Sequence, residues 1–313
     1  MAVILARRFK LIDIPGASGH KQHENPTPMA GGLVLASTFL IVGYFFDWYS
    51  TTANGAIMAG AGIILIFGLL DDALGLNAPQ KILGQALAAT LLVGTGTQVH
   101  LLAIEWINLT LTYLWVIGLV NAFNLVDSMD GLALGLAGIA AAFIFLVTIE
   151  AGQPQLTAIS AGVFGACIGL AFFNLPPAKM FLGDSGAQLL GFLMAAVGMA
   201  YNPVDLPKLS SWFVPILVLG MPIFDTTLVV YSRLKRGVKV YRASRDHTYH
   251  RLCQLGLEPT RAIFTMHLAA IILGFIAFIS LNMSAPIGNV SFILTVLAGL
   301  GMVLALVRWT DVG

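Results

Sequence analysis

Polar side chains suited to metal binding and proton transfer gather in one short segment between two long apolar runs. The segment carries Asn121, Asn124, Asp127 and Asp130, which recur every third residue. On a helical backbone this spacing places the side chains roughly along one face. Carboxylate and amide oxygens suit Mg²⁺, which commonly bridges to substrate phosphates. The segment therefore predicts a hard-cation site, whereas an N-cap and turn before the next helix would explain only one aspartate.

Two further acidic motifs carry similar chemistry. Asp71 and Asp72 end an apolar run, and adjacent carboxylates repel each other, so one tends to keep its proton without a cation. The pair could supply a metal ligand and a general base, or it could simply end a helix at the membrane interface. Asp184 lies in the turn 181–186, whose glycines let a ligand approach the backbone closely. The alternative there is an aspartate that caps a helix.

Basic side chains and histidines near these motifs could bind phosphate groups. Lys81 could contact a phosphate, or it could extend its amine to the membrane surface. The basic segment 233–251 contains His247 and His250. A loop that anchors topology or binds anionic lipid explains the positive charges, whereas the two histidines favour a diphosphate site. Asp225, in the preceding apolar run, could pair with a cation or line a cavity.

The composition indicates an integral membrane protein with many spans. Of 313 residues, 58% are hydrophobic and 10% are charged, whereas a soluble domain carries about 25% charged residues. The net charge of +1 says little about partners, and we expect no nucleic-acid partner. Two cysteines, Cys167 and Cys253, provide neither a disulfide framework nor metal-ligand spacing.

Ten apolar runs have lengths near those that span a bilayer as helices. They lie near residues 33–49, 55–70, 82–104, 109–122, 132–149, 156–173, 187–201, 211–230, 262–281 and 289–308. The run 82–104 contains two glycines and a histidine, so it could break or lie partly in the membrane interface. Residues 1–9 resemble the end of a further helix but are too short to span. We expect an all-α polytopic membrane protein, with residues 1–313 forming one domain of about ten transmembrane helices plus this N-terminal remnant.

The basic side chains predict the orientation of these spans. Lysines and arginines in short loops near helix ends favour the cytosolic side. With ten spans, all sixteen Lys and Arg residues except Lys208 fall on one side of the membrane. The acidic motifs fall on the same side, so we expect the active site at the cytosolic face.

Five motifs, taken in order, resemble those of the polyprenyl-phosphate N-acetylhexosamine-1-phosphate transferases, of the glycosyltransferase family 4 type. They are the segments 26–32 (Pro-Thr-Pro-Met-Ala-Gly-Gly), 68–72, 121–131, 181–186 and 246–252. The resemblance implies transfer of a sugar 1-phosphate from a UDP-activated amino sugar to undecaprenyl phosphate or another polyprenyl phosphate, with release of UMP. It also implies a requirement for Mg²⁺, which Mn²⁺ could replace.

The resemblance implies roles for individual residues. Asp184 would bind Mg²⁺, with Asn124 as a second protein ligand. Asp71 and Asp72 would act on the lipid phosphate, as a base or through the metal, while Asp127 and Asp130 would hold the nucleoside. His247 joins these aspartates as a catalytic candidate. The remaining predicted substrate contacts are Lys81, Asn121, Asn174, Phe181, Gly183, His250 and Arg251.

Departures from the family pattern bear on the donor. Many members carry His-x-His-His in the last loop, whereas residues 247–250 read His-Thr-Tyr-His. The phospho-MurNAc-pentapeptide translocases carry three consecutive histidines, which are absent here, so we favour UDP-GlcNAc and keep translocase activity as an alternative. The resemblance also implies that most of the family's first transmembrane helix lies outside this chain.

Two other classes compete with this interpretation. A transporter would place its ionisable groups near the bilayer midplane, often with internal repeats, whereas here they cluster at one face. A CDP-alcohol phosphotransferase would need an Ala-Arg pair that the segment 131–134 lacks. We therefore expect a multi-pass enzyme of the bacterial plasma membrane that starts a cell-envelope polysaccharide. The sequence does not choose between a monomer and a homodimer.

Overall fold

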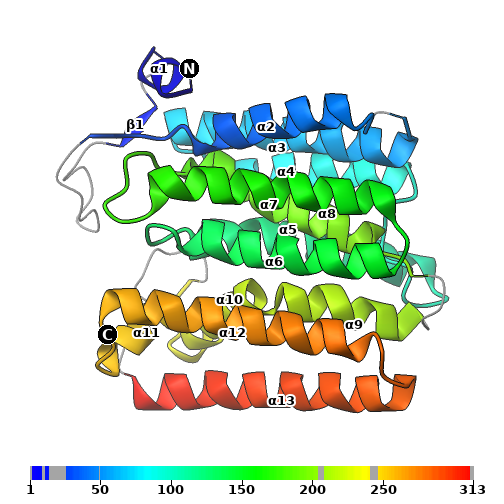
Figure 1. Ribbon diagram of the computed structural model, residues 1–313. Helices are drawn as coiled ribbons and strands as arrows, with labels where there is room; N and C mark the ends of the chain where they lie inside the picture. The colour runs from blue at the N-terminus through cyan, green and yellow to red at the C-terminus, as the bar shows by residue number, and fades with distance from the viewer. Residues whose placement is uncertain are drawn as a thin grey trace.

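The long helices of the protein lie side by side with their connections at two opposite ends (Figure 1). The computed structural model describes residues 2–8, 11–13, 26–48, 50–203, 208–239 and 246–310. Within these ranges the chain forms thirteen helices and two short strands, so the predicted all-α architecture is confirmed.

The helices follow one another with short connections, apart from the small β-pair near the N-terminus. They are α1 (Ala2–Arg8), α2 (Gly31–Phe45), α3 (Thr52–Leu74), α4 (Ala78–Gly94), α5 (Glu105–Val126), α6 (Leu132–Glu150), α7 (Pro154–Asn174), α8 (Gly183–Ala200), α9 (Lys208–Val218), α10 (Gly220–Lys235), α11 (Thr248–Gln254), α12 (Pro259–Ser280) and α13 (Ala285–Trp309). Strands β1 (Ile12–Asp13) and β2 (Thr27–Pro28) pair antiparallel, with Ile12 opposite Pro28.

Local sequence determines the tight turn between α3 and α4. Gly75 ends α3 in the left-handed conformation, with φ 68°, which favours glycine. Asn77 and Gln80 then begin α4 with a capping box, in which each side chain accepts a hydrogen bond from the other residue's backbone N–H. This turn brings Lys81, in the first turn of α4, beside the last turns of α3.

Helix α8 forms the centre of the bundle, and every residue from Ser185 to Met199 is buried. Glycines allow its neighbours to approach closely. A Cβ at Gly68 of α3 would overlap the Cα of Ser185, and a Cβ at Gly191 would lie 2.7 Å from the carbonyl oxygen of Leu119 in α5. Helices α3 and α5 therefore bring their polar ends to the start of α8.

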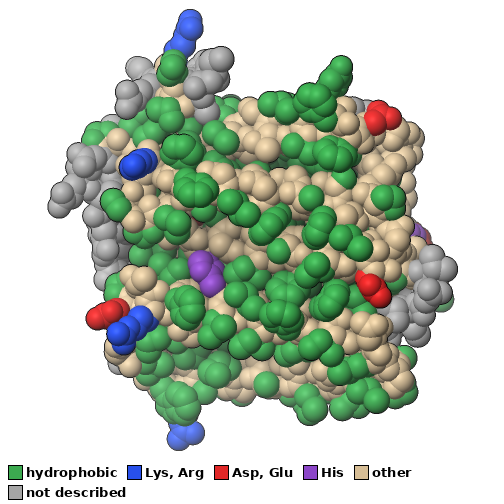
Figure 2. All heavy atoms as spheres, viewed as in Figure 1, with side chains coloured by type: hydrophobic (Ala, Val, Ile, Leu, Met, Phe, Trp, Pro, Cys, Tyr) green, Lys and Arg blue, Asp and Glu red, His purple; other side chains and the backbone are tan. Residues whose placement is uncertain are grey.

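Several helices have the length and composition of membrane spans. In the described chain α3, α5, α6, α7, α12 and α13 meet both criteria, and the pair α9 and α10, bent by 70°, would be a seventh span. Figure 2 shows a face dominated by hydrophobic side chains, with charged groups toward the ends of the helices. The multi-pass membrane architecture is thus supported.

The predicted count of ten spans is not confirmed. Each of the ten predicted runs overlaps a helix or the bent pair. However, α2, α4 and α8 do not meet the length and hydropathy criteria among the described helices. The predicted break in 82–104 is confirmed, because α4 ends at Gly94.

Candidate active site

The acidic motifs meet where α3, α4, α5 and α8 bring their polar ends together. The ammonium group of Lys81 pairs with Asp71 and lies 3.7 Å from a carboxylate oxygen of Asp184. The side chain of Asn124 lies close to Asp184. The structure therefore brings together residues that the sequence places on separate helices.

Asp72 binds the turn that carries Asp184. Its carboxylate accepts hydrogen bonds from the backbone N–H groups of Asp184, at 2.7 Å, and Ser185, at 3.2 Å. These N–H groups belong to the first turn of α8 and lack partners within the helix. Gly183 has φ 74°, and a Cβ there would lie 2.9 Å from Asp72 Oδ2. Asp72 thus caps α8, and glycine is required beside it.

The segment 26–32 supports the same turn from the other side. The N–H groups of Gly31 and Gly32 donate to the carbonyl oxygens of Phe181 and Leu182, both at 3.1 Å, and the N–H of Phe181 donates to Pro28. A Cβ at Gly32 would overlap the hydroxyl of Ser185. The segment 26–32 therefore supports the turn 181–186 through backbone hydrogen bonds and close packing. Phe181 and Gly183 lie in the turn as predicted, and their contacts with substrate stay a prediction.

Asp127 and Asp130 lie in the connection between α5 and α6. Burial, reinforced by the negative charges of Asp184, Asp72 and Asp130, raises the pKa of Asp127 to about 8. Asp130 accepts a hydrogen bond from the N–H of Ala178 at 3.3 Å. Four carboxylates therefore share one region, where a cation would reduce their mutual repulsion.

The amide side chains of Asn121 and Asn174 are engaged by the protein. Asn121 Nδ2 donates to Gln85 and to the carbonyl oxygen of Ile117. The amide of Asn174 accepts from the N–H of Gly131 at 2.9 Å and donates to the carbonyl oxygen of Met180 at 3.0 Å. These contacts give both residues a structural role, and their predicted contacts with substrate stay a prediction.

The donor atoms around Asp184 fit a hard divalent cation. The buried Oδ1 of Asn124 has no hydrogen-bond partner in the described part of the chain, and such an atom is costly unless a ligand reaches it. No three His, Cys, Asp or Glu side chains among the described residues form a metal site. Mg²⁺, however, often takes one or two protein ligands and completes its shell with water and substrate phosphates. Asp184 and Asn124 match that pattern.

A second polar group joins α10 to α11. His247 Nδ1 lies 2.8 Å from Asp225 Oδ2, and the N–H of Thr248 donates to Asp225 Oδ1 at 2.6 Å. Asp225 therefore binds both the ring of His247 and the backbone of Thr248. A carboxylate on Nδ1 fixes the ring and leaves Nε2 as the nitrogen for a ligand. The ring of His250 lies 6.3 Å from that of His247, centre to centre.

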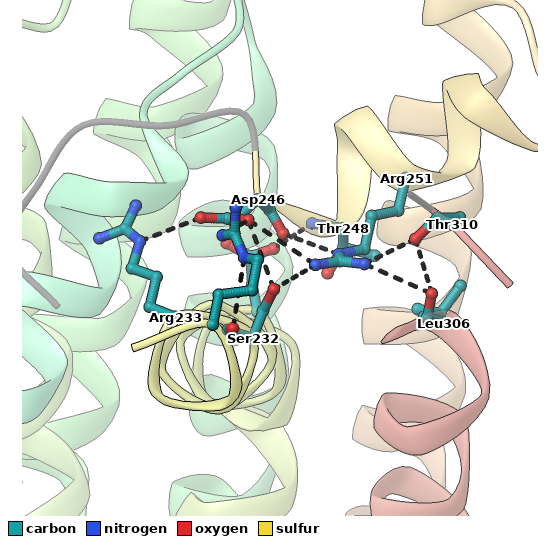
Figure 3. A network of polar contacts seen from close by, with 9 residues as sticks. Ser232, Arg233, Asp246, Thr248, Arg251, Leu306 and Thr310 are labelled. Atoms are coloured by element: carbon teal, nitrogen blue, oxygen red, sulfur yellow. Dashed lines mark hydrogen bonds and ion pairs between the residues drawn. The ribbon is translucent and has the colours of Figure 1, made fainter. Parts of the chain in front are cut away.

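Arg251 lies in a structural network between α10, α11 and α13 (Figure 3). The side chain is 1% exposed. Its guanidinium donates to the hydroxyl of Thr310 at 2.6 Å and to the carbonyl oxygens of Leu306, at 3.4 Å, and Asp246, at 3.1 Å. These contacts bind the end of α13 to the histidine segment, and the predicted substrate contact of Arg251 stays a prediction.

An apolar groove opens along α5, α9 and α10. It has a volume of about 410 Å³, and its lining includes Leu114, Trp115, Trp212 and Thr226. Thr226 directly follows Asp225 in α10. The groove therefore runs along α10, the helix whose Asp225 contacts His247.

Gln85 and Gln188 belong to the site but were missed in the sequence. Both are 1% exposed, and Gln188 donates to Asp71 at 3.3 Å. Each is an amide within a predicted transmembrane run. Such polar groups are costly in lipid and often functional, so their positions were a usable signal.

Comparison with known proteins agrees with this geometry. The family model described as Glycosyl transferase family 4 matches residues 55–202, which include the acidic ends of α3, α5 and α8. A Bacillus subtilis (strain 168) protein described as a probable undecaprenyl-phosphate N-acetylglucosaminyl 1-phosphate transferase is 32% identical over 287 residues, covering 88% of this chain and 78% of the relative. The chain belongs to glycosyl transferase family 4.

Two further relatives carry two different named activities. A decaprenyl-phosphate N-acetylglucosaminephosphotransferase of Mycolicibacterium smegmatis is 31% identical over 310 residues, covering 87% of this chain and 76% of the relative. A phospho-N-acetylmuramoyl-pentapeptide-transferase of Streptococcus pneumoniae (strain 70585) is 29% identical over 276 residues, covering 78% of this chain and 81% of the relative. Of these three relatives, the two N-acetylglucosamine transferases match more of this chain.

Proposed function

We propose that this family 4 protein transfers GlcNAc 1-phosphate from UDP-GlcNAc to a polyprenyl phosphate such as undecaprenyl phosphate and releases UMP. The observation that carries the proposal is the convergence of Asp184, Asn124 and Lys81 with the neighbouring aspartates. The names of the most similar relatives support the same donor and acceptor. The product would begin a cell-envelope polysaccharide.

We infer that the protein crosses the bacterial plasma membrane ten times and holds its acidic cluster at the cytosolic face. The distribution of charge supports this orientation, because all lysines and arginines except Lys208 fall on one side of the ten-span arrangement. In this arrangement the cytosolic side would hold the ends of α3, α5 and α10 and the starts of α4 and α8.

The proposed reaction is one direct displacement at phosphorus. An oxygen of the polyprenyl phosphate forms a bond to the β-phosphorus of UDP-GlcNAc, and the bond from that phosphorus to the bridging oxygen breaks, so the oxygen leaves with UMP. Both substrates are anionic, and catalysis of this kind depends on positioning and charge stabilisation. Mg²⁺ held by Asp184 and Asn124 would supply charge neutralisation.

The chain's own residues would orient the two substrates. Lys81 provides a fixed positive charge beside Asp184. The raised pKa of Asp127 lets it hold a proton near neutral pH, so it can lie against the anionic nucleotide without repulsion. The apolar groove suits the polyprenyl chain. His247, held by Asp225 through Nδ1, would hydrogen-bond to a substrate phosphate through Nε2.

Release of UMP by the purified full chain tests this function. The assay contains Mg²⁺ and undecaprenyl phosphate with UDP-GlcNAc, UDP-GalNAc or UDP-MurNAc-pentapeptide in turn. We expect release with UDP-GlcNAc that requires the lipid. Release only with the pentapeptide donor would instead support the translocase activity, and no release from any donor would overturn the proposal.

A further inference from the structure

A line of hydrogen-bonded side-chain amides runs through the buried interior from α5 to α3. Asn121 Nδ2 donates to Gln85 Oε1 at 2.8 Å, and Gln85 Nε2 donates to Gln188 Oε1 at 3.5 Å. Gln188 Nε2 then donates to Asp71 Oδ2 at 3.3 Å. Four helices, α5, α4, α8 and α3, each contribute one group to this line.

Every amide in the line donates in the same direction. Asn121 begins the line as a donor, and Asp71 ends it as an acceptor. An amide whose carbonyl accepts a hydrogen bond is polarised and donates more strongly. Gln188 therefore presents a reinforced donor to the Asp71 carboxylate.

Asp71 is held from several sides at once. Its Oδ1 accepts the N–H of Leu76 at 2.9 Å, while Oδ2 receives Gln188 and pairs with the ammonium of Lys81. The residue is 5% exposed. A carboxylate enclosed in this way orients Lys81, whose ammonium also faces Asp184 at 3.7 Å.

Packing alone does not require these amides. Gln85 and Gln188 are each 1% exposed, and a buried polar group is costly unless it is hydrogen-bonded. Leucine would fill similar space without this cost. The one charged group that the line reaches is Asp71, which points to a role exerted through that residue.

We propose that Gln85 and Gln188 are positioning residues for the phosphate-binding lysine. They hold the Asp71 carboxylate so that Lys81 directs its ammonium toward Asp184, where the donor phosphates bind. This inference rests on the proposed function. It also assigns Asp71 a positioning role in place of the predicted role as base or metal ligand.

A kinetic double-mutant cycle tests the inference. We compare Gln188→Leu in the wild-type chain and in the Asp71→Asn chain, measuring kcat for UMP release with UDP-GlcNAc. A hydrogen bond to a charged group corresponds to about 10- to 100-fold in rate. We expect a loss of that size in the wild-type chain and less than about twofold in the Asp71→Asn chain, since coupled residues are not additive.

A matched variant separates positioning from stability. Asn54 of α3 is a buried amide that donates to Gln155 of α7 at 3.1 Å, near the opposite end of α3 from Asp71. Asn54→Leu should lower the thermal midpoint as much as Gln188→Leu but leave kcat unchanged in both backgrounds.

Two results would overturn the inference alone, and a third would overturn the proposed function as well. Equal losses of kcat from Gln188→Leu in both backgrounds would overturn the inference, as would a loss of stability without any change in kcat. No UMP release by the wild-type chain from any donor would overturn the proposed function and the inference with it.

Discussion

The carboxylates of the cluster have different surroundings, and each therefore predicts a different effect when it is neutralised. The side chain of Asp184 is 39% exposed and lies near Lys81, whereas Asp71 is enclosed. Asp184→Asn should lower kcat by about 100-fold or more, because it removes the proposed metal ligand, while the thermal midpoint changes little. UMP release measures the effect. Glu150→Gln, an exposed change at the far end of α6, is the control, and equal activity in the two variants would contradict the assignment.

The raised pKa of Asp127 predicts how stability depends on pH without metal. Its pKa is raised from 3.8 to about 8, so the folded state binds this proton more tightly than the unfolded state. The stabilisation is therefore fully present below the unfolded value and is lost as the pH rises toward about 8. Thermal unfolding in metal-free detergent solution should show a midpoint that falls over this range. Asp127→Asn should flatten the profile, and unchanged slopes would contradict the prediction.

At the scale of helices, close contact between α3 and α8 supports the site. A Cβ at Gly68 would overlap the backbone of Ser185, whereas a Cβ at Gly62 of the same helix would meet nothing within 4 Å. Gly68→Ala should destabilise the protein by about 1–3 kcal/mol, as overpacking does, and reduce UMP release. Gly62→Ala is the matched control and should be neutral or slightly stabilising. Equal thermal midpoints for the two variants would argue against this packing.

A substitution at Arg251 tests whether this residue links helices or contacts the substrate. Lysine lacks the planar fork with which Arg251 reaches Thr310 and the carbonyl oxygen of Leu306. Arg251→Lys should therefore lower the thermal midpoint by several degrees and leave the KM for UDP-GlcNAc unchanged. Arg261→Lys, at a side chain that is 77% exposed, is the control. A raised KM for UDP-GlcNAc with unchanged stability would instead support a contact between Arg251 and the substrate.

Sequence patterns could predict the helices but not most contacts between them. Long apolar runs give nearly all helix positions, because hydrophobic length is a local property. The cap that Asp72 provides to α8 joins residues 112 positions apart, and no local signal reports such a pairing. The amides of Asn121 and Asn174 illustrate the same limit, since their partners come from other segments. Helix α8 also does not meet the criteria for a membrane span. Protein, rather than lipid, surrounds this helix.

For the whole molecule, the proposed orientation predicts which connections face the cytosol. Cysteine can be placed at Ala178, in the connection from α7 to α8, or at Glu150, at the opposite end of α6, in a chain that lacks Cys167 and Cys253. An impermeant thiol reagent should label Ala178→Cys only in inverted vesicles and Glu150→Cys only in right-side-out vesicles. The reverse pattern would contradict the cytosolic site.

The central claim is that the acidic cluster catalyses transfer of GlcNAc 1-phosphate to a polyprenyl phosphate. The most direct measurement is mass spectrometry of the lipid after purified protein is incubated with UDP-GlcNAc, Mg²⁺ and undecaprenyl phosphate. We predict a lipid increased by the mass of GlcNAc 1-phosphate, in an amount equal to the UMP released, and none with Asp184→Asn. An unmodified lipid in the presence of wild-type protein, or equal product from the variant, would contradict the account.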